Sequence, residues 1–175
     1  SGGAAIMAAD FAQKHVVPLP QPSPAAAATL KRCIPDFGSS RNPCDVTAQV
    51  VNDPSSLSEC AQALLADAAY GTLVLAQPQA YAPAAHRIGM GGELAKQHGK
   101  MACNVLVSQW LDGPGAREAE EHPHVALFRS MDRCFATLAA WQRRERRRSE
   151  SVQIAPSAQA LPEGAIQIVT SLLAD

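Results

Sequence analysis

Hydrophobic side chains recur at helical spacing near the start of the chain. Ile6, Met7 and Phe11 fall on one side of the segment 4–16 while polar residues fall on the other, which predicts an amphipathic helix. Similar patterns, most of them opened by Pro or Ser, predict further helices over residues 24–34, 54–70, 81–98, 116–121 and 130–148.

Three short, almost wholly apolar runs lie between these segments, at 72–76, 101–107 and 125–128. Such runs are typical of strands that are buried on both faces of a parallel sheet. Leu19, in a proline-rich connector, is predicted to occupy a further short strand. Because strands and helices alternate, we expect an α/β fold, a three-layer doubly wound parallel sheet.

The first residues predict a tight turn that enters a helix. A helix N-terminus presents unpaired N–H groups and about half a positive charge, so it attracts anions. Glycine lets a phosphate approach the backbone closely, and a serine hydroxyl adds a donor. The candidate phosphate-binding residues are therefore Ser1, Gly2, Gly3 and Ala4. A purely structural glycine turn is the alternative.

A second polar loop spans residues 39–47 and contains Asn42 and Asp45. A capped turn and a loop beside an active site both fit this composition. Ligands of doubly wound sheets bind beyond the carboxyl ends of the strands. We expect the Gly2-Gly3 turn, the Pro78 turn and the Asp112-Gly113 loop to meet at that edge.

The composition is that of an ordinary globular domain. Of the 175 residues 47% are hydrophobic and 18% charged, with a net charge of -1, which indicates neither disorder nor a nucleic-acid partner. No apolar run approaches the roughly 20 residues that span a bilayer, so no membrane partner is expected. The five cysteines include no C-x-x-C pair, and their odd number favours a reducing, cytoplasmic location.

The C-terminal part of the chain changes character. Five arginines lie within residues 143–148, at the predicted end of a helix. Positive charge is favourable there because of the helix dipole and because the side chains are solvated. Contact with a phosphate or an acidic partner is the alternative role. We expect a domain over 1–146, a linker over 147–162, and the start of a following domain over 163–175, where apolar residues return.

Other constellations of reactive residues are disfavoured. Four histidines have no carboxylate or thiol at ligand spacing, so no metal site is expected at His86, His98, His122 or His124. Nothing local marks a cysteine as an activated nucleophile. Trp110 and Trp141 are expected in the core or at a domain interface.

Taken in order, three blocks resemble the NDP-forming acyl-CoA synthetases, relatives of succinyl-CoA synthetase. They are Ser1-Gly2-Gly3-Ala4 through Asp10, then Asn42-Pro43-Cys44-Asp45-Val46-Thr47 against a family Asn-Pro-Val-Asp pattern, and Phe128-Arg129-Ser130 with Asp132-Arg133. The resemblance covers residues 1–146. It implies a succinyl-CoA synthetase-like, flavodoxin-like ligase domain whose first strand is missing here, followed by a linker and the start of an ATP-grasp domain.

The chemistry that the resemblance implies is acyl-CoA formation from a carboxylic acid, CoA and ATP, through an acyl phosphate and a phosphohistidine. CoA, ATP and Mg would serve the whole enzyme, and this domain alone would bind none of them. Its implied partners are the CoA-binding, phosphohistidine-bearing and ATP-grasp domains, and a homo-oligomer is compatible with them. Residues 1–4 would hold the phosphoryl group, with Asn42 and Asp45 nearby.

The chain also departs from the family pattern. None of its histidines has the small-residue setting of the phosphorylated histidine, and Cys44 replaces a usual aliphatic residue, so the chain alone is not expected to catalyse the reaction. The rival interpretation is a non-catalytic flavodoxin-like module for binding or domain docking. A flavin-binding relative is disfavoured because no aromatic pair is placed to sandwich the ring.

Overall fold

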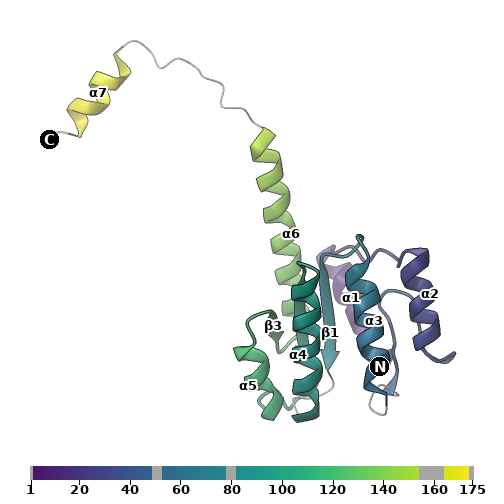
Figure 1. The fold of residues 1–175 in the computed structure, drawn as a ribbon. Helices are drawn as coiled ribbons and strands as arrows, with labels where there is room; N and C mark the ends of the chain where they lie inside the picture. Colours follow the sequence, from purple (N-terminus) through teal and green to yellow (C-terminus); the bar gives the residue numbers. More distant parts are fainter. Residues whose placement is uncertain (1, 49–52, 78–81, 154–163, 174–175) are drawn as a thin grey trace. The chain divides into compact units, whose positions relative to one another are not determined.

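The computed structural model describes residues 2–48, 53–77, 82–153 and 164–173. Contacts within the chain divide it into two units, Ser1–Ala140 and Trp141–Asp175, and each is described by itself. The described strands all belong to the first unit (Figure 1).

A three-stranded parallel sheet forms the centre of the first unit. Its strands are β1 (Thr72–Gln77), β2 (Met101–Leu106) and β3 (Val125–Phe128), in the order β1-β2-β3. Thr72 pairs with Met101, and Ala102 pairs with Val125. The bounds agree with the three apolar runs. The middle strand is buried from Ala102 to Leu106, as expected for a strand covered on both faces.

One face of the sheet is covered by α1 (Gly2–His15) and by the first part of α6 (Met131–Gln153). Ala12 of α1 packs in one cluster with Val105 of β2 and with Cys134 and Phe135 of α6. Cys103 belongs to the same cluster because side chains two residues apart on a strand share a face.

The opposite face is covered by α3 (Pro54–Ala66) and α4 (Ala82–Gln97). Leu65 of α3, Leu73 of β1 and Ala95 of α4 share a second cluster. The helix α4 lies very close to β1 at Gly91, where an added Cβ would stand 2.5 Å from Cδ1 of Leu75. A side chain at Gly91 would require Leu75 to shift.

Two smaller helices complete the helical layers. Ala116 of α5 (Pro114–Glu121) packs against Leu106 of β2, and Leu30 of α2 (Pro24–Cys33) packs against Cys60 of α3. Helices therefore cover both faces of a parallel sheet. The expected doubly wound α/β architecture is confirmed.

Some predicted details of the first unit are wrong. The helix predicted to reach residue 70 ends at Ala66, because the carboxylate of Asp67 accepts hydrogen bonds from the backbone N–H groups of Ala69, at 3.0 Å, and Ser23, at 2.8 Å. Leu19 forms no strand; its side chain instead packs, partly buried, against the cluster around Ala12. The connector thus contributes to the core without sheet pairing.

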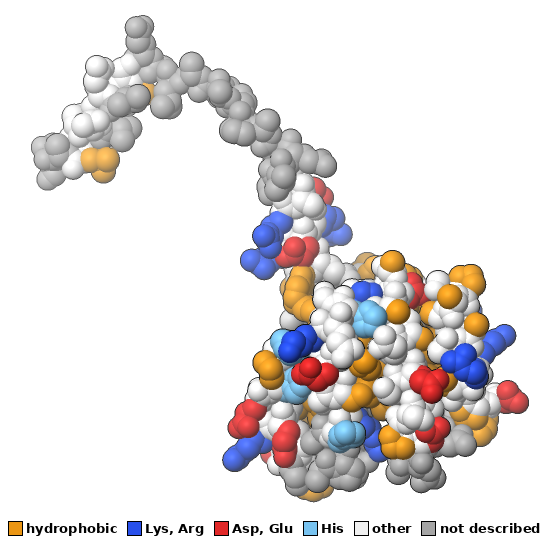
Figure 2. Space-filling view, in the orientation of Figure 1, with side chains coloured by type: hydrophobic (Ala, Val, Ile, Leu, Met, Phe, Trp, Pro, Cys, Tyr) orange, Lys and Arg blue, Asp and Glu red, His pale blue; other side chains and the backbone are white. Residues whose placement is uncertain are grey.

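The second unit contains the rest of α6 and the helix α7 (Ala165–Leu172). The arginines at 143–148 lie inside α6 and not at its end, because the helix continues to Gln153; their side chains are exposed (Figure 2). The linker expected over 147–162 therefore begins within a helix, and residues 154–163 lie outside the described part. The start of a further domain after residue 163 stays a prediction.

Neither tryptophan is a core residue. The exposed fraction is 53% for Trp110, in the first unit, and 45% for Trp141, in the second. The alternative expectation, that they lie at a domain interface, stays a prediction.

Candidate functional site

The N-terminus of α1 is the first component of the candidate site. The helix begins at Gly2, so Gly2 and Gly3 lie in its first turn and do not form a separate turn before it. Ser1 lies outside the described residues. The N–H groups of a first helical turn have no partner within their own helix, so those of Gly2, Gly3 and Ala4 are the natural anion donors here.

Space around the two glycines differs. A Cβ added at Gly3 would meet no atom within 4 Å, whereas one added at Gly2 would lie 3.1 Å from Oδ2 of Asp45. The backbone of α1 is thus open on the side of Gly3. On the side of Gly2 it adjoins the second predicted site loop.

Asp45 is brought to the start of α1 by the loop that carries it. The backbones of Ser39 and Asp45 exchange two hydrogen bonds, of 3.1 and 2.9 Å, which close the loop. Oδ1 of Asp45 accepts from the N–H of Thr47 at 2.9 Å. A carboxylate in this place complements the positive end of the α1 dipole. It also adds a negative charge that a phosphate would have to approach.

Asn42 has a different role. Its Nδ2 donates to the carbonyl of Pro20 at 3.0 Å, and its backbone N–H donates to Oε1 of Gln21 at 3.2 Å. Nε2 of Gln21 donates in return to the carbonyl of Asn42 at 3.0 Å. These contacts fasten the loop to the connector between α1 and α2. Asn42 therefore positions the loop that carries Asp45.

Two further loops, at Pro78 and at Asp112-Gly113, were expected at the same edge of the sheet. Asp112 pairs with Arg129, 3.0 Å from Oδ1 to Nη2, and Arg129 also pairs with Glu120 at 2.7 Å. Hydrogen bonding to Glu120 raises the pKa of Arg129. Pro78 lies outside the described residues. The convergence of the three loops stays a prediction.

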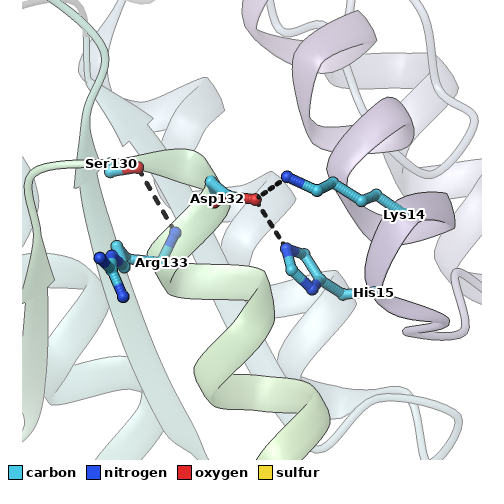
Figure 3. A network of polar contacts seen from close by, with 5 residues as sticks. All are labelled: Lys14, His15, Ser130, Asp132 and Arg133. Atoms are coloured by element: carbon cyan, nitrogen blue, oxygen red, sulfur yellow. Dashed lines mark hydrogen bonds and ion pairs between the residues drawn. The ribbon is translucent and has the colours of Figure 1, made fainter.

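A polar network that the sequence analysis missed joins α1 to α6 (Figure 3). Oδ1 of Asp132 lies 2.8 Å from Nζ of Lys14 and 2.7 Å from Nε2 of His15. The hydrogen bond with Lys14, and then that with His15, lowers the pKa of Asp132. Ser130 caps α6 by accepting from the N–H of Arg133 at 3.4 Å. The sequence signal for this network was the placement of charge. Lys14 and His15 lie in the last turn of α1, and Asp132 lies in the first turn of α6.

The cysteines form two groups that the sequence spacing did not reveal. Cys33, Cys44 and Cys60 come together between α2, the 39–47 loop and α3. Burial raises the pKa of Cys44 to about 11 and that of Cys60 to about 12. Thiols with raised pKa values are poor nucleophiles. Cys44 and Cys60 are therefore not activated as nucleophiles.

Cys103 and Cys134 form the second group, in the core between β2 and α6, where both are buried. Their mutual hydrogen bond, followed by burial, raises the pKa of Cys134.

Among the described residues no cluster of His, Cys, Asp or Glu has the geometry of a metal site. None of the described helices combines the length and the apolar character that a membrane span requires.

Among the described residues, the side chain of Asn104 is buried without a hydrogen-bond partner. Asn104, in the middle of β2, is 1% exposed, and within the described structure neither its Oδ1 nor its Nδ2 makes a hydrogen bond. It shares a strand face with Ala102 and Leu106, toward α4 and α5. A single Asn in an apolar run was the available sequence signal, and the run was interpreted only as a buried strand.

Comparison with known proteins confirms the fold. No protein-family model and no curated protein matches the sequence. Solved structures of the dinucleotide-forming acetyl-coenzyme A synthetase 1 of Ca. Korarchaeum cryptofilum, in an apo form and in complex with phosphate and ADP, are similar, each with a TM-score of 0.68. The identities are 18% and 19%, and each match covers 89% of this chain and 34% of the solved one. The chain thus spans about a third of that synthetase.

Proposed function

We propose that this chain is a domain of an acid-CoA ligase, an NDP-forming acyl-CoA synthetase, and that the N-terminus of α1 helps to hold the phosphoryl group of a phosphohistidine. The histidine, the CoA site and the ATP site would lie in other domains of the same enzyme, together with the Mg ion. The 175 residues alone would then be inactive.

The observation that carries this proposal is the start of α1 at Gly2. Gly2 and Gly3 lie in the first turn and have no side chains that could cover their backbone N–H groups. The space beside Gly3 is open. A phosphoryl group carried on a side chain from another domain needs this kind of access. Preorganised N–H donors stabilise developing phosphoryl charge without reorganisation.

The similarity to an acetyl-coenzyme A synthetase supports the ligase context. Because the match covers only 34% of that chain, the partner domains, the cytoplasmic location and the acid substrate are part of the proposal. The resemblance of the sequence blocks at residues 1–10 and 42–47 favours the same assignment.

The proposal is tested in the complete synthetase by replacing Gly3 with leucine. A Cβ added at Gly3 meets no atom within 4 Å, and the branched side chain of leucine would obstruct an approaching phosphoryl group. We expect the phosphohistidine level and the turnover to fall on the order of a hundredfold, the usual effect of losing one oxyanion donor. Gly89→Leu is the matched control, since Gly89 is also helical with no atom within 4 Å of an added Cβ.

Unchanged phosphorylation in Gly3→Leu would remove the phosphoryl-holding role. It would favour the docking-module interpretation, in which the glycines serve only the backbone. Equal losses in Gly3→Leu and Gly89→Leu would assign the effect to folding and also count against the proposal.

A further inference from the structure

The last part of α6 concentrates positive charge on a fully exposed stretch. Five of the six residues from Arg143 to Arg148 are arginines, and Glu145 is the sixth. Every residue of the stretch 141–150 is exposed (Figure 2). Oε1 of Glu145 lies 3.8 Å from Nη1 of Arg144 and 3.4 Å from Nη1 of Arg148. One carboxylate cannot balance five guanidinium groups, so this stretch is strongly basic.

The same stretch is only marginally stable as a helix. Arg143 and Arg147 are four residues apart, and so are Arg144 and Arg148, so like charges lie next to each other along the helix surface. The apolar clusters of the described structure contain no residue of 141–150. A short helical stretch without packing is marginal in water. We therefore expect the last turns of α6 to open readily.

Ser149 follows the arginines directly, in these last turns, and is exposed. Its Oγ donates to the carbonyl of Arg146 at 2.8 Å and to the carbonyl of Glu145 at 3.1 Å. A serine hydroxyl that bonds back to a carbonyl three or four residues earlier slightly weakens its helix. When the turn opens, these bonds break and the Ser149 hydroxyl is released as an accessible nucleophile.

The position of Ser149 relative to the arginines is specific. Arg146 and Arg147 stand three and two residues before it, and no other Ser or Thr of the sequence has arginine at both of these positions. In an opened segment, two guanidinium groups can each form bidentate bonds with carboxylates of a partner. An enzyme that binds basic segments through such carboxylates would therefore select the Ser149 hydroxyl.

We propose that Ser149 is a phosphorylation site, modified by a protein kinase whose peptide-binding groove is acidic. Oγ of Ser149 attacks the γ-phosphorus of ATP, and a new O–P bond forms. The bond from that phosphorus to the β,γ-bridging oxygen breaks, ADP leaves, and the hydroxyl proton passes to a carboxylate of the kinase. The phosphate adds about -1.5 to -2 charges at pH 7 beside the five arginines. It would thus weaken any contact of this basic stretch with an acidic partner.

The test incubates the 175-residue chain with Mg-ATP and the catalytic subunit of cyclic-AMP-dependent protein kinase, which has an acidic peptide groove. Mass spectrometry maps the phosphate, and the initial rate is compared among variants. Ser149→Ala removes the acceptor, and Arg146→Ala/Arg147→Ala removes the two arginines that would guide the kinase. Arg143→Ala/Arg144→Ala is the matched control, because it removes two arginines from the same helix, farther from Ser149.

We expect about one phosphate per chain, at Ser149, and none in Ser149→Ala. The rate should fall about a hundredfold or more in Arg146→Ala/Arg147→Ala and change less than about threefold in the control. Amide hydrogen exchange of the unmodified chain should be at least about tenfold faster over 146–150 than over 134–138, which packs in the core. Phosphate on another residue, equal rates in the two double variants, or equal exchange in the two segments would each overturn the proposal.

Discussion

The carboxylate of Asp132 lies 2.7 Å from Nε2 of His15 and couples the end of α1 to the start of α6. Lys14 reaches the same oxygen at 2.8 Å. The two helices cover one face of the sheet, and the first turn of α1 is the candidate site. This network therefore fixes the helix on which the proposed function depends.

Asp132→Asn is expected to lower the midpoint of thermal unfolding at neutral pH. Because the pKa of Asp132 is lowered in the folded state, its contribution is fully present above its ordinary value of 3.8 and is lost as the pH falls through the lowered value. The difference between wild type and variant should thus shrink as the pH falls below 3.8. Thermal unfolding from pH 7 to pH 2 measures it. Asp10→Asn, which removes an exposed carboxylate from α1, is the control. A difference independent of pH would contradict the interpretation.

Asp45→Asn is expected to strengthen phosphate binding at the start of α1. The amide keeps an acceptor for the N–H of Thr47 but removes the negative charge beside Gly2. One like charge a few ångströms away costs on the order of 1 kcal/mol in water, or about fivefold in affinity. Titration with inorganic phosphate measures the change at low ionic strength. Weaker binding by the variant would show that Asp45 supports the anion and does not repel it.

Gly92→Ala is expected to destabilise the protein, although alanine favours helices. A Cβ at Gly92 would lie 2.4 Å from Cε1 of His122 and 2.7 Å from Cγ2 of Val125, so the packing of α4 must shift. Overpacking of this kind lowers the free energy of unfolding by about 1–3 kcal/mol. Gly89→Ala, in the same helix with open space, should raise it by about 0.5–1 kcal/mol. Urea denaturation compares the two, and equal effects would refute the close packing.

Asn104→Val is expected to stabilise the fold. An unpaired buried amide costs about 1–3 kcal/mol, and valine suits a strand buried on both faces. The free energy of unfolding, measured by urea denaturation, should rise by about 1 kcal/mol or more. A decrease would show that the amide has a hydrogen-bonding partner in solution, such as a buried water.

The sequence predicted the parts of the fold that depend on local pattern. The strand Val125–Phe128 is fully apolar, and the strand Thr72–Gln77 has polar residues only at its two ends. Helices begin at clear capping signals, as α2 does at Ser23-Pro24. Leu19 was misjudged because sheet pairing needs a neighbour that no local pattern reveals. The end of α3 was misjudged because Asp67 is recruited by Ser23, 44 residues away in the sequence.

The candidate site was predictable only in part. Gly2 and Asp45 were both identified from turn chemistry, and the structure brings them together. Asn42 was identified on the same grounds, but its contacts with Pro20 and Gln21 are structural. The ion pairs of Asp132 and the isolation of Asn104 depend on tertiary packing between elements far apart in the chain, which spacing and composition do not encode.

The account is tested most directly by amide NMR of the 175-residue chain during titration with inorganic phosphate. The start of α5, at Gly115 and Ala116, provides an internal comparison from a second helix N-terminus. We predict saturable shifts of the Gly2, Gly3 and Ala4 amides that exceed those at Gly115 and Ala116. Shifts that are absent at Gly2, Gly3 and Ala4, or no larger there than at α5, would contradict the phosphoryl-holding role of α1.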